Sequence, residues 1–331
     1  MAESPGPIYY LAPHADDVAM SCAGSLLADV RAGHPVTLIT VFLSGPQAAV
    51  RRAEDEAAAR ALGCRYLSLD LFDAPDRPEV RGALGLFAPL GPEHLGVTNE
   101  VVERLRWHIG PGASLRAPLA VGGHIDHRIV HVAARALAYD LQLELGYYED
   151  LPYSLVRYAL GRRLEALEVP LAERHLPGCE RASRDEELAA LRAFQLELTP
   201  RSWEGQPGFL RWLPGGRQLG AWVVARSIYG ADPVGQRPGF PLKLVPRLRA
   251  VPAAAPERLQ ALAAYASQWP LFAASPEALL QRLFAHGATR SAEPAPPGQA
   301  WERLWLDQGV RPPQPASPPP HRPTPAAGTG A

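Results

Sequence analysis

The chain has 331 residues, of which 47% are hydrophobic and 20% are charged, with a formal net charge of −1. A chain of this length can hold one large α/β domain or two smaller ones. Its balanced charge and lack of a long basic run exclude a typical nucleic-acid-binding protein. Its three scattered cysteines form neither a disulfide framework nor a Cys-x-x-Cys metal site. With no secretory signal and no run of about 20 apolar residues, the sequence predicts a soluble, cytoplasmic protein without a membrane span.

The first 150 residues alternate between strand-like and helix-like segments. Strands are expected at 8–12, 35–43, 66–71, 115–121 and 143–148, and helices at 19–32, 51–62, 99–109 and 125–140. Gly33 and Gly63 follow two of these helices, at the position that a C-cap glycine prefers. The alternation predicts an α/β fold, a Rossmann-like three-layer domain with a mostly parallel sheet.

The rest of the chain is less regular. Helices are expected at 183–196, 256–267 and 276–286, and residues 219–229 resemble a strand. The loop at 74–97 is rich in Gly and Pro and longer than most connections, which predicts a functional lid. Proline dominates from Arg311 onward, so we expect a disordered tail there. An alternative role for this tail is an extended ligand for an SH3-like partner.

Two clusters of metal-binding residue types follow two of the predicted strands. His14-Ala15-Asp16-Asp17 comes after the strand at 8–12, and His124-Ile125-Asp126-His127 comes after the strand at 115–121 and the pair Gly122-Gly123. Loops at the carboxyl ends of parallel strands lie on one rim of the sheet, so the clusters can meet there. Two histidines and a carboxylate suit a catalytic zinc site, and Fe²⁺ can occupy the same set of ligands.

The spacing within each cluster separates possible ligands from other groups. His14 and Asp17 lie three positions apart and can converge on one ion in a turn. His124 and His127 repeat this spacing at the start of a helix, so one can bind the metal while the other faces the substrate. His131 lies one turn further on, where it has ligand spacing, but we assign it to helix packing. The expected site has two histidine ligands and one carboxylate ligand.

The remaining polar groups suggest a mechanism of amide hydrolysis. Zinc would lower the pKa of a bound water to about 7. We expect Asp16 to take the proton of that water. We expect His124, protonated or hydrogen-bonded, to stabilise the negative charge that develops on the carbonyl oxygen. Asp126 is predicted to hold His124 in the required tautomer.

These motifs resemble those of the PIG-L/LmbE family of zinc-dependent N-deacetylases. Residues 13–18 are similar to its first motif, Ala-His-Pro-Asp-Asp-Glu, and residues 124–127 to its second, His-Pro-Asp-His. The resemblance implies zinc on His14, Asp17 and His127, with Asp16 as the general base. It also implies that His124 acts on the transition state.

Several positions depart from the motifs of this family. Val18 stands in place of the usual glutamate, and Ala15 and Ile125 stand in place of prolines. Activity should fall if the glutamate tunes the base, and survive if it only braces the loop. All the chemically necessary groups are present, so we expect a working enzyme.

The resemblance implies further substrate contacts. The family has an arginine at the start of its second crossover helix that reaches a substrate hydroxyl, here Arg51. Residues 148–153 resemble the aromatic strand end of a bacterial branch, which makes Tyr148 a candidate substrate contact. Aromatic side chains that could stack on a sugar ring are Tyr147, Tyr148, Tyr153, Trp203 and Trp212.

The resemblance covers most of the chain. Residues 265–268 are similar to the family's late Tyr-x-Ser-Gln helix, and residues 301–305 to its final ordered segment. It implies one LmbE-like domain over residues 1–309, with a core at 8–150 and a C-terminal elaboration at 151–309. The proline-rich tail then covers 310–331.

The leading functional hypothesis is hydrolysis of an N-acyl, most simply N-acetyl, amide on an amino sugar of the N-acetylglucosamine type. One alternative is a zinc amidase that acts on a thiol conjugate or on a secondary-metabolite intermediate such as an acyl-aminoglycoside. Another is a non-catalytic, carbohydrate- or nucleotide-binding Rossmann-like protein. No Gly-x-Gly-x-x-Gly follows the first strand, and Asp16 and Asp17 would repel a pyrophosphate there, which disfavours a dinucleotide site. No pattern indicates the oligomeric state.

Overall fold

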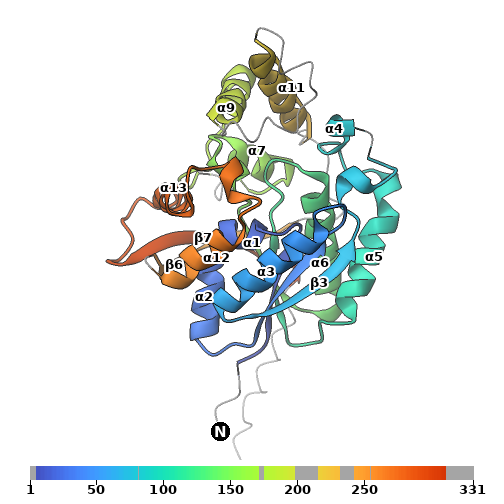
Figure 1. Cartoon of the computed structure of the whole chain (residues 1–331), viewed down its shortest axis with the longest axis vertical. Helices are drawn as coiled ribbons and strands as arrows, with labels where there is room; N and C mark the ends of the chain where they lie inside the picture. Colours follow the sequence, from blue (N-terminus) through green and yellow to red (C-terminus); the bar gives the residue numbers. More distant parts are fainter. Residues whose placement is uncertain are drawn as a thin grey trace, which may run out of the picture.

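A computed structural model describes residues 5–80, 82–170, 175–197, 215–231, 242–253 and 255–310. Its centre is a seven-stranded sheet in the order β3-β2-β1-β4-β5-β7-β6 (Figure 1). The strands are β1 (Ile8–Ala12), β2 (Val36–Phe42), β3 (Arg65–Leu71), β4 (Ser114–Pro118), β5 (Glu144–Tyr148), β6 (Leu244–Pro252) and β7 (Gln299–Asp307). The first five are parallel, whereas β7 runs antiparallel to both β5 and β6. The predicted Rossmann-like fold with a mostly parallel sheet is confirmed.

Helices cover both faces of this sheet. One face packs against α1 (Asp17–Ser21), α2 (Ala23–Arg31), α3 (Ala48–Leu62), α12 (Pro256–Ala264) and α13 (Pro276–Ala288). The other face packs against α5 (Leu95–Arg106), α6 (Ile125–Leu141) and α7 (Ala159–Ala166). Alternate residues of β1 divide between the two cores: Tyr10 points to the first and Leu11 to the second. No helix in the described part of the chain is long and apolar enough to cross a membrane.

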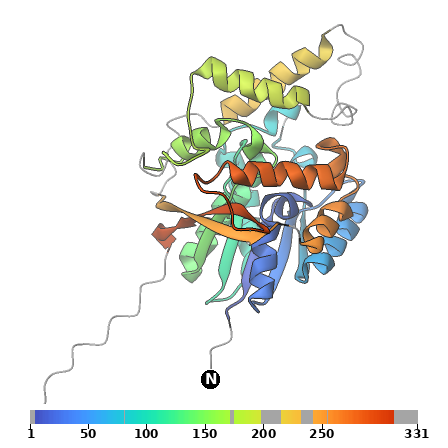
Figure 2. The ribbon, with the colours of Figure 1, turned by 90° about the vertical axis from the view of Figure 1, so that its left-hand side faces the viewer.

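The short helix α4 (Gly82–Gly85) lies within the predicted loop at 74–97, and two further helices, α9 (Arg184–Glu197) and α11 (Gly216–Ala231), form an outer layer (Figure 2). The prediction of a strand at 219–229 is wrong, because this segment belongs to α11. Its buried residues, Ala221, Ala225 and Ile228, follow helical spacing. They pack with α9, a partner that a short apolar run cannot reveal.

The predicted helix at 19–32 is interrupted at Cys22, where α1 ends and α2 begins. The carboxylate of Glu302, on β7, accepts hydrogen bonds from the backbone N–H groups of Gly24 (3.0 Å) and Ser25 (2.7 Å). A carboxylate stabilises a helix N-terminus, so a second helix starts here. The short α1 that results places Asp17 at its first position, on the rim of the sheet.

The residues resembling a Tyr-x-Ser-Gln helix lie just beyond the end of α12 and hold α3 in place. The Tyr265 hydroxyl donates to Asp55 at 2.8 Å. The N–H and hydroxyl of Ser267 both donate to Glu54 at 2.7 Å. These bonds fix the N-terminal half of α3, which carries Arg51.

A buried ionic cluster ties the end of β5 to β7 and α13. Glu149 accepts hydrogen bonds from Arg303 Nε (2.5 Å), Arg290 Nε (2.8 Å) and Trp305 Nε1 (3.1 Å). Burial alone would raise the pKa of Glu149, but the two arginines outweigh it and lower this pKa to about 2. Burial lowers the pKa of His286 to about 3, and the neutral ring accepts a hydrogen bond from Arg290. Folding therefore favours the deprotonated form of both groups.

Replacing Glu149 with glutamine should lower the free energy of unfolding at pH 7 by about 3 kcal/mol, because two buried arginines lose their counter-charge. In the wild type, the contribution of Glu149 is complete above pH 4.5 and disappears as the pH falls towards 2. His286 adds a loss of stability in the same direction between pH 6.5 and 3. Denaturant unfolding across this range measures both effects, with Glu56→Gln on the exposed face of α3 as the control. A Glu149→Gln protein with wild-type stability and acid dependence would contradict this account.

Candidate metal centre

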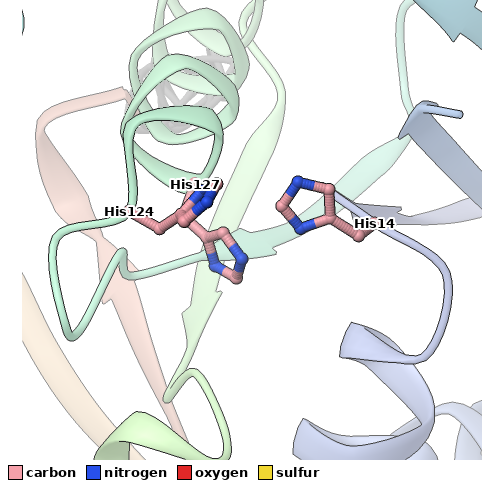
Figure 3. A group of neighbouring side chains, drawn as sticks. All are labelled: His14, His124 and His127. Carbon is pink, nitrogen blue, oxygen red and sulfur yellow. The ribbon is translucent and has the colours of Figure 1, made fainter. Parts of the chain in front are cut away.

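The two predicted clusters meet at the carboxyl edge of the sheet, beyond the adjacent strands β1 and β4. His14 lies in the loop after β1, whereas His124 and His127 lie at the start of α6. Figure 3 shows the rings of His124 and His127 facing that of His14 across the space between the two elements. Ring nitrogens of all three histidines lie within 4.8 Å of one another. The pairing of β1 with β4 thus brings together residues that are more than 100 positions apart in the sequence.

Asp17 completes a set of atoms with the spacing of metal ligands. Its Oδ2 lies 3.5 Å from His14 Nδ1 and 3.4 Å from His127 Nε2. Two ligands of a tetrahedral zinc ion, each at about 2.0–2.1 Å from the metal, are about 3.3 Å apart. The same Asp17 oxygen accepts the backbone N–H of His14 at 2.8 Å, which fixes the turn. The three residues therefore fit a zinc ion in donor type, and Asp17 fits it in its distance to each histidine.

Carboxylates also set the tautomers of two histidines. His14 Nε2 donates to Asp126 Oδ2 at 2.9 Å, and His127 Nδ1 donates to Asp150 Oδ1 at 2.6 Å. Each imidazole then has a lone pair on its other nitrogen, and these are the two nitrogens nearest to Asp17. Metal-binding histidines are held in this way by carboxylates that do not touch the metal.

The prediction that Asp126 holds His124 is wrong, because its carboxylate contacts His14. Asp126 is the second residue of α6, and its backbone N–H, not its side chain, donates to His124 Nδ1 at 3.3 Å. The side chain points across to the loop after β1, 112 residues away in sequence. Spacing within one motif cannot show which partner on another strand the side chain reaches.

Sequence reasoning missed Asp150 as a functional residue. It lies two residues after β5, is fully buried, and also accepts the backbone N–H of Val121 at 2.9 Å. It therefore connects His127 to the loop after β4. Its position just after a parallel strand, next to the strand that precedes the second cluster, is the signal that could have found it.

The charge distribution of this cluster favours a bound cation. Burial lowers the pKa of His14, but hydrogen bonds to Asp126 and Asp17 outweigh it and raise this pKa well above the usual value. His127 behaves similarly, because Asp17 and Asp150 raise its pKa against the effect of burial. A proton on either histidine balances the negative charge of the neighbouring aspartates, and a bound metal ion would balance the same charge.

His124 differs from the other two histidines. It is the N-cap of α6, and its Nδ1 accepts the N–H of Asp126. Burial lowers the pKa of His124 to about 3, so the ring is neutral and carries its proton on Nε2. Phe87 packs edge-on against this ring, with 5.8 Å between the centroids. His124 is thus a neutral hydrogen-bond donor, like the histidines that polarise carbonyl groups in other enzymes.

Asp16 has an unusual backbone conformation. Its φ of 90° lies in the left-handed region that non-glycine residues seldom adopt. Within the described part of the chain, its half-buried carboxylate takes part in no hydrogen bond or ion pair. Burial and the nearby Asp17 raise its pKa well above the usual value. A carboxylate with a raised pKa and free oxygens is suited to proton transfer.

The predicted substrate contact Arg51 lies in the first turns of α3, at the edge of this site. Its Nη1 is 3.5 Å from Asp73 Oδ2, a residue that sequence reasoning missed. Arg51 Nε and Asp73 Oδ1 are buried and have no hydrogen-bond partner. A donor and an acceptor, both unsatisfied, thus lie side by side.

Tyr148, the other predicted substrate contact, is in the core. It is 1% exposed, and its hydroxyl donates to the carbonyl oxygen of Leu11 at 2.8 Å. Tyr147 is also buried, where it stacks on His131 at 4.2 Å between ring centroids and supports the packing role of that histidine. Both predictions of a stacking surface are wrong, because β5 lies inside the sheet with both faces covered.

Of the predicted aromatic residues that the structure describes, Tyr153 reaches the metal centre. Its ring centroid is 6.4 Å from that of His127. It also packs against Gly122, where a Cβ would lie 2.4 Å from Tyr153 Cγ. The glycine before the second cluster thus makes room for this ring. Trp203 and Trp212 lie outside the described residues, as does the proline-rich tail.

Both motifs lie in a part of the chain that is similar to known proteins. Residues 9–138 match the family model described as GlcNAc-PI de-N-acetylase, PIG-L. The 2′-N-acetylparomamine deacetylase of Streptomyces fradiae is 36% identical over 176 residues, which cover 47% of this chain and 60% of that relative. The chain therefore matches less than two thirds of the length of this relative.

Solved structures show the same fold at low sequence identity. The zinc-inhibited form of teicoplanin deacetylase is 18% identical with a TM-score of 0.56, covering 91% of this chain and 97% of that one. The deacetylase of A40926 pseudoaglycone is 19% identical with a TM-score of 0.53, covering 90% and 96%. The sequence motifs lie within the region that matches the PIG-L family model, and the chain shares the fold of these deacetylases.

Proposed function

We propose that this protein is a metal-dependent hydrolase that removes the acetyl group from an N-acetylated amino sugar, releasing acetate and a free amine. The observation that carries this proposal is the arrangement around Asp17 Oδ2, which has a histidine nitrogen at 3.5 Å and another at 3.4 Å. Each of these histidines donates a hydrogen bond to a different buried carboxylate. The PIG-L match and the deacetylase relative add support.

We assign His14 Nδ1, Asp17 and His127 Nε2 as the metal ligands. Zinc suits this set, and Fe²⁺ can also occupy it. A metal bound there would lower the pKa of a water and polarise the amide carbonyl. The alternative set of three histidines has less support, because the Nε2 of His124 carries a proton when its Nδ1 accepts the N–H of Asp126.

The other residues carry out the proton transfers and bind the developing charge. Asp16 takes a proton from the attacking water and passes it to the nitrogen of the leaving amine as the C–N bond breaks. A raised pKa makes the carboxylate a stronger base, and the same group, once protonated, can act as the acid. The Nε2–H of His124 donates a hydrogen bond to the oxygen that becomes negative in the transition state.

Replacing His124 with alanine should leave the metal bound and lower kcat by about 10²- to 10³-fold, because one donor to the oxyanion is lost. Zinc content and kcat measured on the same preparation test this. His108→Ala is the matched control, since His108 is exposed at the end of α5. If His124→Ala lost the metal, His124 would belong to the ligand set.

The edge of the site indicates a sugar-like substrate. The partly exposed side chains of Arg51 and Asp73 offer a donor and an acceptor group to neighbouring hydroxyl groups, which donate and accept at once. Tyr153 lies close enough to His127 to border a bound ring. Because the S. fradiae relative is a 2′-N-acetylparomamine deacetylase, we include N-acetylated aminoglycosides in the substrate class.

The experiment that tests this function is amine release from 2′-N-acetylparomamine, N-acetylglucosamine and small N-acetylated glycosides, with and without a chelator. Release that the chelator stops supports the proposal. N-acylated thiol conjugates belong in the same screen, because they define the alternative amidase. A non-catalytic sugar-binding protein would bind these compounds equally well with the chelator and release no amine. No observation at the site favours either alternative.

A further inference from the structure

Asp126 is the meeting point of the metal centre and the segment that follows β3. Its Oδ2 accepts hydrogen bonds from His14 Nε2 (2.9 Å) and from the backbone N–H of Ala74 (3.0 Å). Its Oδ1 forms an ion pair with Arg77 Nη1 at 2.6 Å. The carboxylate is fully buried. Two of its three contacts thus come from residues 74–77, outside both sequence motifs.

Arg77 is itself held rigidly. Its Nε donates to Glu79 Oε1 at 2.9 Å, and its Nη1 also donates to the carbonyl oxygen of Phe72 at 3.1 Å. The guanidinium lies 5.0 Å from the ring centroid of Phe42, and the side chain is only 6% exposed. A planar cation fixed at several points can orient a carboxylate, whereas a flexible one cannot.

We infer that Arg77 is a positioning residue of the metal centre, acting through Asp126 on His14; this rests on the proposed function. Arg77 holds the Asp126 carboxylate where it accepts the Nε2–H of His14. The Nδ1 of His14 is then kept free and directed towards Asp17. Without Arg77, Asp126 would be a buried carboxylate lacking its counter-charge, and its hold on His14 would weaken.

Arg77 also braces its own turn through Phe72 and Glu79, so the test must separate this structural role from the positioning role. Glu79→Gln keeps an oxygen that can accept the Nε–H of Arg77 and leaves the Arg77–Asp126 ion pair, so it removes a charge beside Arg77 without freeing it and is the matched control. Asp126→Asn removes the carboxylate through which Arg77 acts. If the inference holds, the loss caused by changing Arg77 should vanish once Asp126 is changed.

The experiment measures zinc affinity by chelator competition in wild type, Arg77→Met, Asp126→Asn, the double variant and Glu79→Gln. We expect Arg77→Met to bind zinc about tenfold more weakly, the size of effect typical of residues that orient metal ligands. Asp126→Asn should lose at least as much, and the double variant no more than Asp126→Asn. Glu79→Gln should match the wild type. With substrate, Arg77→Met should lower kcat and leave KM unchanged.

Wild-type zinc affinity in a folded Arg77→Met protein would overturn the inference, and so would additive losses in the double variant. If Arg77→Met does not fold, Arg77→Gln replaces it in the same cycle with the same expectations. Zinc affinity needs no substrate, so the two proposals can fail separately. A wild type that binds zinc but deacetylates nothing refutes the proposed activity alone, whereas one that binds no zinc refutes both.

Discussion

Replacing Asp17 with alanine should abolish metal binding and turnover together. Asp17 Oδ2 lies 3.5 Å from His14 Nδ1 and 3.4 Å from His127 Nε2, the two proposed ligand nitrogens. It is also the only negative ligand in the proposed set, so its loss leaves two neutral imidazoles to hold a divalent cation. We expect zinc affinity to fall by more than about 100-fold, beyond the loss typical of residues that only support ligands. Chelator competition and kcat/KM should fall in parallel.

The control for this experiment is Asp140→Ala, because Asp140 is an exposed aspartate near the end of α6, away from the metal centre. It should bind zinc and turn over like the wild type. An Asp17→Ala protein that folds and binds zinc with wild-type affinity would contradict the assignment. The ligands would then be the three histidines, His14, His124 and His127.

Replacing Asp16 with asparagine should lower turnover, as the change at Asp17 does, but should leave the metal bound. Asparagine is the sharper choice than alanine, because Asp16 has a φ of 90° and asparagine tolerates the left-handed conformation. The amide cannot take a proton from water, so kcat should fall by about 10²- to 10⁴-fold. Zinc content and affinity should stay at the wild-type level, since Asp16 is not in the ligand set.

Near-normal kcat in Asp16→Asn would contradict the proposed mechanism. Loss of zinc in this variant would instead mean that Asp16 holds the metal or the turn that presents Asp17. Asp140→Asn serves as the matched control, since it makes the same chemical change on an exposed surface. Together the two aspartate variants separate metal binding from proton transfer.

The sequence was informative about the metal centre where its residues follow parallel strands. His14 and Asp17 leave β1, and His127 follows β4, so the rule that strand ends share one rim of the sheet brought them together correctly. Orientation was not predictable in the same way. Whether Asp126 faces His124 or His14 depends on how the first turn of α6 meets a loop 112 residues away.

Other supporting residues escaped prediction because their partners are distant. Asp73 and Arg77 lie in or next to a loop that shows no periodicity, and Asp150 lies in a segment whose most visible feature in the sequence is its aromatic residues. The break at Cys22 depends on Glu302, which is 278 residues from Gly24. Alternation of strands and helices therefore predicted the layers of the fold, but not the long-range contacts that end its elements.

The antiparallel edge of the sheet shows the same limit. β6 contains Pro246 and two arginines, so it lacks the continuous apolar run of a buried parallel strand. It forms because β7 pairs with it along its whole length, and β7 in turn pairs with β5. The prediction for α11 is wrong for the converse reason. Its apolar run resembles a strand, and the packing of α9 against one face of the helix cannot be read from that run.

The most direct test of the central claim is amine release from 2′-N-acetylparomamine by one preparation, measured as purified, after chelation and after zinc is returned, with metal content determined at each stage. The account predicts about one zinc or iron per chain, release that stops when the metal is removed, and recovery when zinc is restored. Release that continues unchanged in metal-free protein would contradict it. So would a chain that takes up no metal and releases no amine.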